Sequence, residues 1–394
     1  MSFFCQSEAS GDEILSSEAK NTSEQSTSKD PSQEKKPFYG GQAVIEGVMM
    51  RGRYSWGMAV RRPSGGIARM AYPLDSPGSA HKWMRLPIVR GVVGLYDSLS
   101  LGIKALGISA NIGMEDAGTS KSKDQVETED TSAHTEIVAS ADSEKQVDAE
   151  IEADVVDIPD PDPSSLEKNE KATFGFMELA ITVLIALALA VGLFVVVPLV
   201  VVKQFETTFA NPFLFNLVEG IIRIVIFLIY ILVVSLLPDL RRVFQYHGAE
   251  HKVINAYEAC DRSDAVEAKR FPTLHPRCGT GFLLLVMVVA VFVFAIVGKP
   301  ALPYLVLSRL IGIPVIVGIS YEVGIKWAGQ HSGGFFARII LWPGMQLQRL
   351  TTREPSDDQL EIAAIALTEV MALDEIRRAA IEAEKAKEAV PLAI

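Results

Sequence analysis

Two short polar stretches carry residue types that bind metal ions. The first contains His247, Glu250 and His251 in the spacing H-x-x-E-H. If residues 243–259 form a helix, the three side chains share one face, and both imidazoles can reach one ion. The carboxylate between them could then take a proton from a water molecule at that ion, as in the inverted zinc-peptidase signature. The spacing therefore indicates hydrolytic chemistry, with Glu250 as the catalytic base.

The second stretch, His275-Pro276-Arg277-Cys278, supplies a further imidazole and a thiol. Its proline favours a turn over a helix, so His275 and Cys278 can approach the first stretch from outside that helix. Imidazole and thiolate are ordinary ligands of zinc. We therefore predict a divalent metal cofactor, with zinc ahead of other ions. The predicted ligands are His247 and His251 together with His275 or Cys278.

Three further carboxylates are candidates for a supporting or alternative role. Glu258 lies seven residues after His251 on the same helical face, and could ligate the ion or orient a histidine. Glu322 ends an apolar segment and is a further candidate ligand or base. Glu46 stands alone among apolar neighbours in the glycine-rich run 40–52 and could approach the same site. Simple hairpin geometry is the alternative explanation for that run.

A structural interpretation of these residues stays open. Histidine, arginine and glutamate at the ends of apolar segments also hydrogen-bond lipid head groups or cap helices. An H-x-x-E-H string alone is a weak signal. The second His/Cys stretch on the same loop is what favours a metal site over a polar cluster without an ion.

The composition indicates a membrane protein. Of the 394 residues, 49% are hydrophobic, and many of them gather in long segments with few charges. The net charge of −11 arises in segment 111–170, which holds 18 Asp and Glu against 4 Lys. The remainder is close to neutral, so the chain shows no basic footprint for nucleic acid.

Four segments are long enough to cross a bilayer, at about 20 residues per crossing. They are 179–202, 213–237, 279–298 and 301–321. Loop 238–278 holds seven Lys and Arg, whereas the loops on the other side hold only Lys203 and Lys299. Because basic residues favour cytoplasmic loops, we predict a multi-pass protein of the cytoplasmic membrane, with the histidine-bearing loop and both termini in the cytoplasm.

Three charged residues fall inside the predicted spans. Glu219 and Arg223 lie one helical turn apart in the second span, and Arg309 lies in the fourth. Charges inside a membrane are functional hypotheses by default. A structural ion cluster that joins the two spans and a path for a small solute are both open.

The predicted fold is an α-helical integral membrane protein with about four transmembrane helices, a small N-terminal β module and interfacial amphipathic helices. The expected units are a disordered tail (1–37), the β module (38–83), an interfacial amphipathic helix (84–110), an acidic disordered linker (111–170), a four-helix membrane domain (171–350) and a C-terminal cytoplasmic helix (351–394). The last helix could pack internally, form a homo-oligomer or bind a membrane-protein partner. The other expected partner is the lipid bilayer.

Four motifs resemble those of the YqhQ-type family, a bacterial family of uncharacterised membrane proteins often labelled predicted metal-dependent enzymes. They are the run 40–52, Tyr246-His247-Gly248-Ala249-Glu250-His251-Lys252, His275-Pro276-Arg277-Cys278-Gly279-Thr280 and Leu350-Thr351-Thr352-Arg353-Glu354-Pro355. The likeness covers about 38–110 and 172–372. It implies an integral membrane protein with a metal site, and it implies no substrate.

The function expected from the sequence is a metal-dependent membrane enzyme, hydrolytic in type, with its site on the cytoplasmic face. A non-catalytic membrane scaffold or assembly factor is the alternative, with a structural metal or a polar cluster in place of the active site. A small-solute carrier that uses Glu219, Arg223 and Arg309 is the third class.

Overall fold

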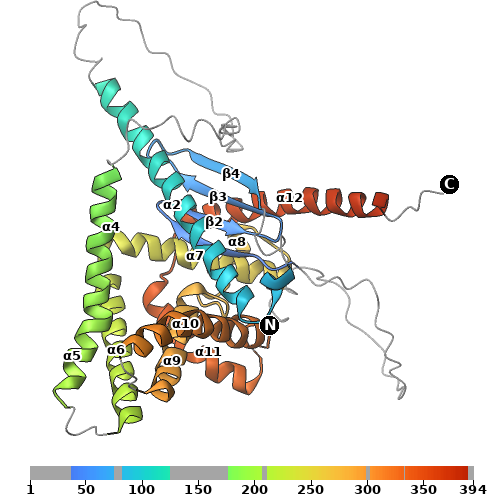
Figure 1. Ribbon diagram of the computed structural model, residues 1–394. Coiled ribbons are helices and arrows are strands. Elements are labelled where there is room, and N and C mark those ends of the chain that lie inside the picture. Colours follow the sequence, from blue (N-terminus) through green and yellow to red (C-terminus); the bar gives the residue numbers. More distant parts are fainter. Residues whose placement is uncertain are drawn as a thin grey trace, which may run out of the picture.

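The computed structural model describes residues 37–74, 82–124, 176–205, 211–298, 302–331 and 333–388. Within these ranges the chain is mostly helical, with one small sheet near its N-terminal end (Figure 1). This confirms the helical fold class and the N-terminal β-structure expected from the sequence. The predicted tail and most of the acidic linker lie outside the described residues.

The sheet is a meander of four antiparallel strands in the order β1-β2-β3-β4. The strands are β1 (Gly40–Val44), β2 (Gly47–Arg51), β3 (Ser55–Arg61) and β4 (Ile67–Pro73). Glu46 lies in the first turn with a φ of 54°. This left-handed conformation is uncommon for a residue other than glycine, so other contacts must hold the turn in place.

Helices form the rest of the described chain. They are η1 (Lys82–Arg85), α2 (Val89–Asp124), α4 (Phe176–Val191), η2 (Gly192–Val196), α5 (Val197–Lys203), α6 (Pro212–Ser235), α7 (Pro238–Cys260), α8 (Ala265–Ala268), α9 (Gly279–Val297), α10 (Leu302–Ser320), η3 (Tyr321–Ala328), α11 (Phe335–Thr351) and α12 (Asp357–Glu388). The elements η2 and η3 are π-helices. Figure 1 shows α7 lying between the sheet and the group formed by α6, α9, α10 and α11.

The sheet is covered on both faces. Alternate residues of a strand point to opposite faces, and Val48 and Met50 accordingly join a core with α7 and α12, whereas Met49 faces the other way. On that second face, α2 contributes Leu101 and Ala105 to the core. The predicted β module and C-terminal helix, which lie at opposite ends of the sequence, therefore pack on each other.

One buried carboxylate joins α12 to the sheet. Asp374 accepts hydrogen bonds from the backbone N–H of Arg53 and of Tyr54, both at 2.9 Å, and from the Ser55 hydroxyl at 2.5 Å. Its side chain is buried, so removing it leaves two backbone donors without a partner. Such charge-assisted bonds contribute about 1.5–3 kcal/mol each.

We therefore expect Asp374→Ala to lower the free energy of unfolding by about 3 kcal/mol or more, because the orphaned donors stay buried. The midpoint of thermal unfolding of the purified protein should fall by roughly 5–10 °C. The neighbouring Glu375→Ala is the matched control, since Glu375 is exposed on the same helix. Equal midpoints for the two variants would contradict this role of Asp374.

Five helices within the described residues are long and apolar enough to cross a membrane, where the sequence predicted about four. Four of them, Leu184–Lys203, Pro212–Ser235, Gly279–Val297 and Ile311–Ala328, overlap the predicted spans. The additional helix, Val89–Met114, falls in the segment predicted to lie on the membrane surface.

The charges of this additional helix are what indicate a position on the membrane surface from the sequence. In the structure, Asp97 forms an ion pair with Arg51, Arg90 pairs with Glu322, and Lys104 lies over the ring of Trp56, 5.3 Å from its centroid. The charges are thus satisfied by partners from distant parts of the chain.

Candidate metal centre

Helix α7 places the H-x-x-E-H residues on one face, as the spacing required. Glu250 and His251 are buried, and the Oε2 atom of Glu250 lies 4.0 Å from Nε2 of His247 and 3.6 Å from Nε2 of His251. The two imidazole ring centroids are 4.5 Å apart. Both imidazoles therefore present Nε2 toward the same carboxylate.

Cys278 approaches this face from the end of the His-Pro-Arg-Cys turn. It is the N-cap residue of α9, and its Sγ atom lies 3.3 Å from Nε2 of His247. One ligand atom from each of His247, His251 and Cys278 can be chosen so that all three lie within 4.8 Å of one another. Two imidazole nitrogens and a thiolate at this separation suit a zinc ion.

Backbone carbonyl groups fix the orientation of both imidazole rings through their Nδ1 atoms. Nδ1 of His247 donates to the carbonyl oxygen of Thr351 at 2.8 Å, and Nδ1 of His251 donates to that of Thr273 at 2.5 Å. A carbonyl can only accept, so each Nδ1 carries the proton and each Nε2 is left as the ligand atom. This arrangement is usual for metal-bound histidines. The donor chemistry therefore fits a divalent metal.

The segments that carry these two carbonyls are held by neighbouring contacts. A Cβ atom on Gly248 would lie 2.0 Å from the carbonyl oxygen of Arg353, so the glycine lets α7 approach the segment after α11. The buried side-chain amide of Gln348 bonds both the N–H and the carbonyl of His275, at 2.8 and 2.9 Å. Gln348 thus ties helix α11 to the His-Pro-Arg-Cys turn.

Strand β1 completes the centre from the side of the sheet. A Cβ atom on Gly41 would lie 2.7 Å from Cγ of Glu250. A larger residue at that position would push the carboxylate out of place. The glycine-rich run 40–52, which the sequence suggests is a single strand, forms the hairpin of β1 and β2, and its Gly41 also makes room for the predicted base.

The electrostatics of the centre favour a thiolate beside a protonated imidazole. Burial lowers the pKa of His247, but the hydrogen bond to Cys278 and the negative charges of Cys278 and Glu250 outweigh it and raise that pKa to about 9. Burial raises the pKa of the Cys278 thiol, but hydrogen bonds from His247 and His251 and their charge hold it well below its usual value. The pair shares one proton that a metal ion would displace.

His275 lies next to the group but not within it. Its ring centroid is 5.6 Å from that of His251, and its Nε2 atom is buried without a hydrogen-bond partner among the described residues. Burial, followed by the charge of His251, lowers the pKa of His275 to about 4. A buried, neutral, unpartnered imidazole nitrogen is rare. Of the two predicted alternatives for the third ligand, Cys278 lies closer to His247 and His251.

The three supporting carboxylates lie in different places. Glu258 is beside the centre, with Oε2 3.7 Å from Nε2 of His275, and it forms an ion pair with Arg277. Glu322 is paired with Arg90 of α2.

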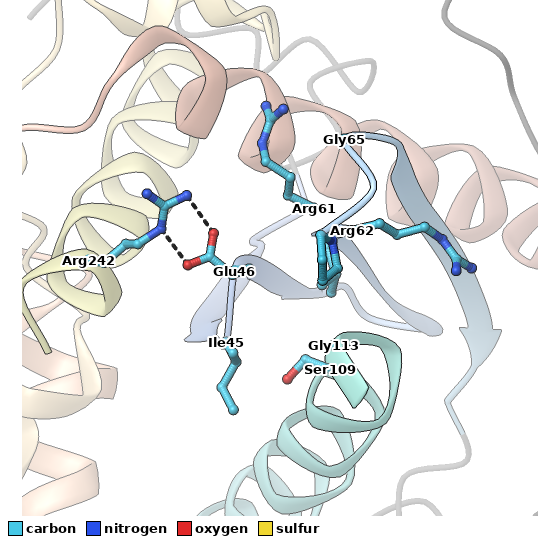
Figure 2. Close-up of a pocket in the computed structure, with 10 residues that line it drawn as sticks. Ile45, Glu46, Arg61, Arg62, Gly65, Ser109, Gly113 and Arg242 are labelled. Carbon is cyan, nitrogen blue, oxygen red and sulfur yellow. Dashed lines mark hydrogen bonds and ion pairs between the residues drawn. The ribbon is translucent and has the colours of Figure 1, made fainter. Parts of the chain in front are cut away.

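Glu46 is paired with Arg242, near the start of α7, and accepts a hydrogen bond from the Tyr246 hydroxyl at 3.3 Å. Figure 2 shows this ion pair at one side of a separate cavity. Glu46 thus acts on α7 before His247 rather than on the centre itself.

The charged group predicted inside the spans is only partly described. Glu219 is buried and forms an ion pair with Arg223 one turn later in α6. Arg309 lies in α10, but its side chain lies outside the described part of the structure. The described pair neutralises itself.

Sequence reasoning missed the parts of the centre that act through the backbone. The carbonyls of Thr273 and Thr351 carry no side-chain signal, although Thr351 lies within one motif noted above and Thr273 lies just before another. The hydrogen bonds between Gln348 and His275 join residues more than seventy positions apart, and no local sequence pattern indicates them. Gly41 and Gly248 were visible as glycines, but their contact partners were not.

Fold and site together define a mostly helical protein with a small four-stranded sheet, several apolar helices and a His/Cys group that could hold a metal ion. The chain belongs to the family described as "Protein of unknown function (DUF1385)", whose profile matches residues 86–373. It is similar to "Uncharacterized protein YqhQ" of Bacillus subtilis (strain 168), with 29% identity over 341 residues, which cover 86% of this chain and 93% of that protein. No solved structure matches the chain. The resemblance to the YqhQ-type family is confirmed.

Proposed function

We propose that this protein is a metal-dependent hydrolase of the cytoplasmic membrane, with a divalent ion, zinc first, held by His247, His251 and Cys278. The observation that carries the proposal is the convergence of one ligand atom from each of His247, His251 and Cys278 within 4.8 Å. Both imidazoles are turned to this point by carbonyls that bind their Nδ1 atoms. Structural zinc sites close four protein ligands around the ion, whereas catalytic ones use three and keep one position open.

The chain's own groups can then perform acid–base work. A bound divalent ion would supply Lewis acidity and lower the pKa of water at the open position. Glu250, buried between the two histidines, is placed to take a proton from a water molecule there and pass it to a leaving group. Gly41 and α7 fix the position of its carboxylate, so little reorganisation is needed.

The membrane part of the proposal rests on the apolar helices and on the distribution of basic residues. Spans from α4–α5, α6, α9 and α10–η3 would cross the bilayer, with loop 238–278 and the sheet in the cytoplasm. Helix α2 would lie along the membrane surface instead of crossing it, because Leu101, Ala105 and Ile112 on one face pack into the core of the sheet. Leu99 and Leu106 on another face stay exposed and would contact lipid.

A Glu250→Gln variant tests the catalytic role. We expect it to keep its metal content, because Glu250 is not among the three ligands, and to lose about 10²–10⁴-fold in hydrolytic rate, because the amide cannot accept the proton. Hydrolysis would be measured on lipid esters, phosphoesters and peptides presented in detergent micelles, and metal content by mass spectrometry. A metal-loaded wild-type protein that hydrolyses nothing on this panel would indicate a structural metal in a scaffold.

A second candidate function is favoured by the pairing of Cys278 with His247. A thiolate at the start of a helix, hydrogen-bonded to an imidazole, is the arrangement of a cysteine nucleophile. Cys278 would attack a carbonyl carbon, and His247 would give its proton to the leaving group. Activity by this route would survive chelation of metal and be lost on alkylation of Cys278, whereas the metal-dependent route would be lost on chelation.

A further inference from the structure

Helix α11 has one buried face and one exposed apolar face. Gly344 and Leu347 are buried on the inner side. The opposite side carries Phe335 and Trp342, which are 73% and 63% exposed. Ile339, also exposed, lies between them, and the three follow the i, i+4, i+7 spacing of one helical face. Single exposed apolar side chains are ordinary, but a contiguous group of large ones marks a surface that another molecule covers.

Two arginines beside this apolar face lack partners. Arg338 and Arg349 are exposed, and the second follows the first by about three helical turns, so both lie on one side of α11. Neither guanidinium group forms a hydrogen bond or an ion pair within the described part of the chain. The sequence of α11 holds no Asp or Glu. The helix therefore carries two uncompensated positive charges next to its apolar face.

Helix α11 lies at the expected cytoplasmic surface of the bilayer. It follows the candidate span Ile311–Ala328 after a short loop, and it packs on the candidate span Gly279–Val297 (Figure 1). A Cβ atom on Gly344 would lie 2.9 Å from Cα of Gly281, so α11 is in close backbone contact with the first turn of α9. In the orientation proposed above, the end of the former span and the start of the latter both lie at the cytoplasmic surface.

The inner face of α11 holds the candidate metal centre. Thr351 provides the carbonyl that binds Nδ1 of His247, and the side-chain amide of Gln348 binds the backbone of His275. Cys278 also lines a narrow cavity of about 20 Å³ between α9, η3 and α11. The candidate ligands and the exposed apolar face thus lie on opposite sides of one helix. Contacts made on the exposed face would therefore fix the helix that orients His247.

We propose that α11 lies in the cytoplasmic interface of the bilayer, with its exposed apolar face among the lipid chains and Arg338 and Arg349 at the phosphate groups of anionic lipids. The proposal rests on the membrane part of the proposed function and is independent of the metal ion. Tryptophan and phenylalanine are typical of the apolar face of an interfacial helix, and arginine of its polar flank. An arginine side chain can extend from that flank to the head groups, and its fork of donors matches phosphate. The two uncompensated charges and the contact with two candidate spans favour the membrane over a second protein.

The first test locates Trp342 by quenching its fluorescence with lipids that carry bromine on their chains. The full chain is reconstituted into bilayers of phosphatidylcholine and phosphatidylglycerol, and the contribution of one tryptophan is the difference between wild type and a variant. Trp342→Phe keeps the face apolar. Trp56→Phe is the matched control, because Trp56 is only 3% exposed and lies in the core of the sheet. We expect the Trp342 contribution to be quenched and the Trp56 contribution to remain.

The second test measures the preference for anionic lipid. Bromine is placed either on phosphatidylglycerol or on phosphatidylcholine in mixtures of the two, and we expect phosphatidylglycerol to quench Trp342 more strongly. Arg338→Gln should lower the relative affinity for phosphatidylglycerol by about fivefold, the equivalent of about 1 kcal/mol for one basic residue near an anionic surface. Arg338→Gln/Arg349→Gln should abolish the preference. Arg53→Gln, which removes an exposed arginine between β2 and β3, should leave it unchanged.

Each contrary outcome points to a different conclusion. A Trp342 contribution that resists quenching as fully as that of Trp56, in a chain that does integrate into the bilayer, would overturn this proposal alone. Equal quenching by the two lipids in wild type, or a preference kept by the double arginine variant, would also overturn it. A chain that stays in solution without detergent and does not associate with vesicles would overturn the membrane part of the proposed function as well. Unquenched Trp342 together with a dimer that Phe335→Ser/Trp342→Ser dissociates would assign the face to a second copy of the chain.

Discussion

Protein purified without chelator is expected to carry about one divalent ion per chain, and a His247→Ala/His251→Ala variant about none. Two of three ligand atoms disappear in the variant, and a lone thiolate does not hold zinc against solvent and buffer. Metal content would be measured by mass spectrometry and by titration with zinc. Because the ion binds only the folded chain, zinc should also raise the thermal midpoint of the wild type and leave that of the variant unchanged.

His331→Ala is the matched control for this experiment. His331 is exposed, and its Nδ1 bonds the carbonyl of Trp327 within its own turn, so its removal lowers the number of histidines without touching the centre. Metal-free wild type that takes up no zinc at micromolar concentration would contradict the metal centre. Equal zinc uptake by the double variant and the wild type would place the ion elsewhere.

The spacing of ligands was predictable because it is local. His247, Glu250 and His251 lie within one turn of α7, and helical geometry alone brings i, i+3 and i+4 together. Whether Cys278 or His275 joins them depends on how the turn before α9 is held against α11. That depends on Gln348, and through it on packing between segments that sequence spacing does not relate. The choice between the two ligands therefore had to wait for the structure.

The fold shows the same division between local and distant effects. The short, glycine-bounded apolar run 40–52 predicts β-structure, and long apolar runs predict helices. Helix α2 was harder to place because its charges are satisfied from outside: Arg51 and Glu322 come from other parts of the chain. A segment with several charges can thus have them paired by distant parts of the chain, which its own sequence does not show. The contact of the sheet with α12 through Asp374 likewise joins the two ends of the sequence, and no pattern in the sequence indicates that they meet.

Zinc affinity is expected to rise by about 50-fold between pH 7 and pH 9. The metal-free His247–Cys278 pair holds one proton, because the thiolate and Glu250 raise the pKa of His247 to about 9. Zinc binds neutral imidazole and thiolate, so binding must release that proton. Below the pKa, each pH unit of acidification costs about tenfold in apparent affinity, and the dependence levels off above it. The measurement is a zinc titration against a competing chelator at several pH values.

The Cys278→Ser variant is the control for this pH dependence of zinc affinity. Removing the thiolate removes its negative charge and its hydrogen bond, two causes that raise the pKa of His247, so that pKa falls and less of the imidazole is protonated between pH 7 and pH 9. Zinc should then bind more weakly at every pH, but with little change in affinity between pH 7 and pH 9. A wild-type affinity that is flat over this range would contradict the shared proton, and a slope retained in Cys278→Ser would assign the proton to another group.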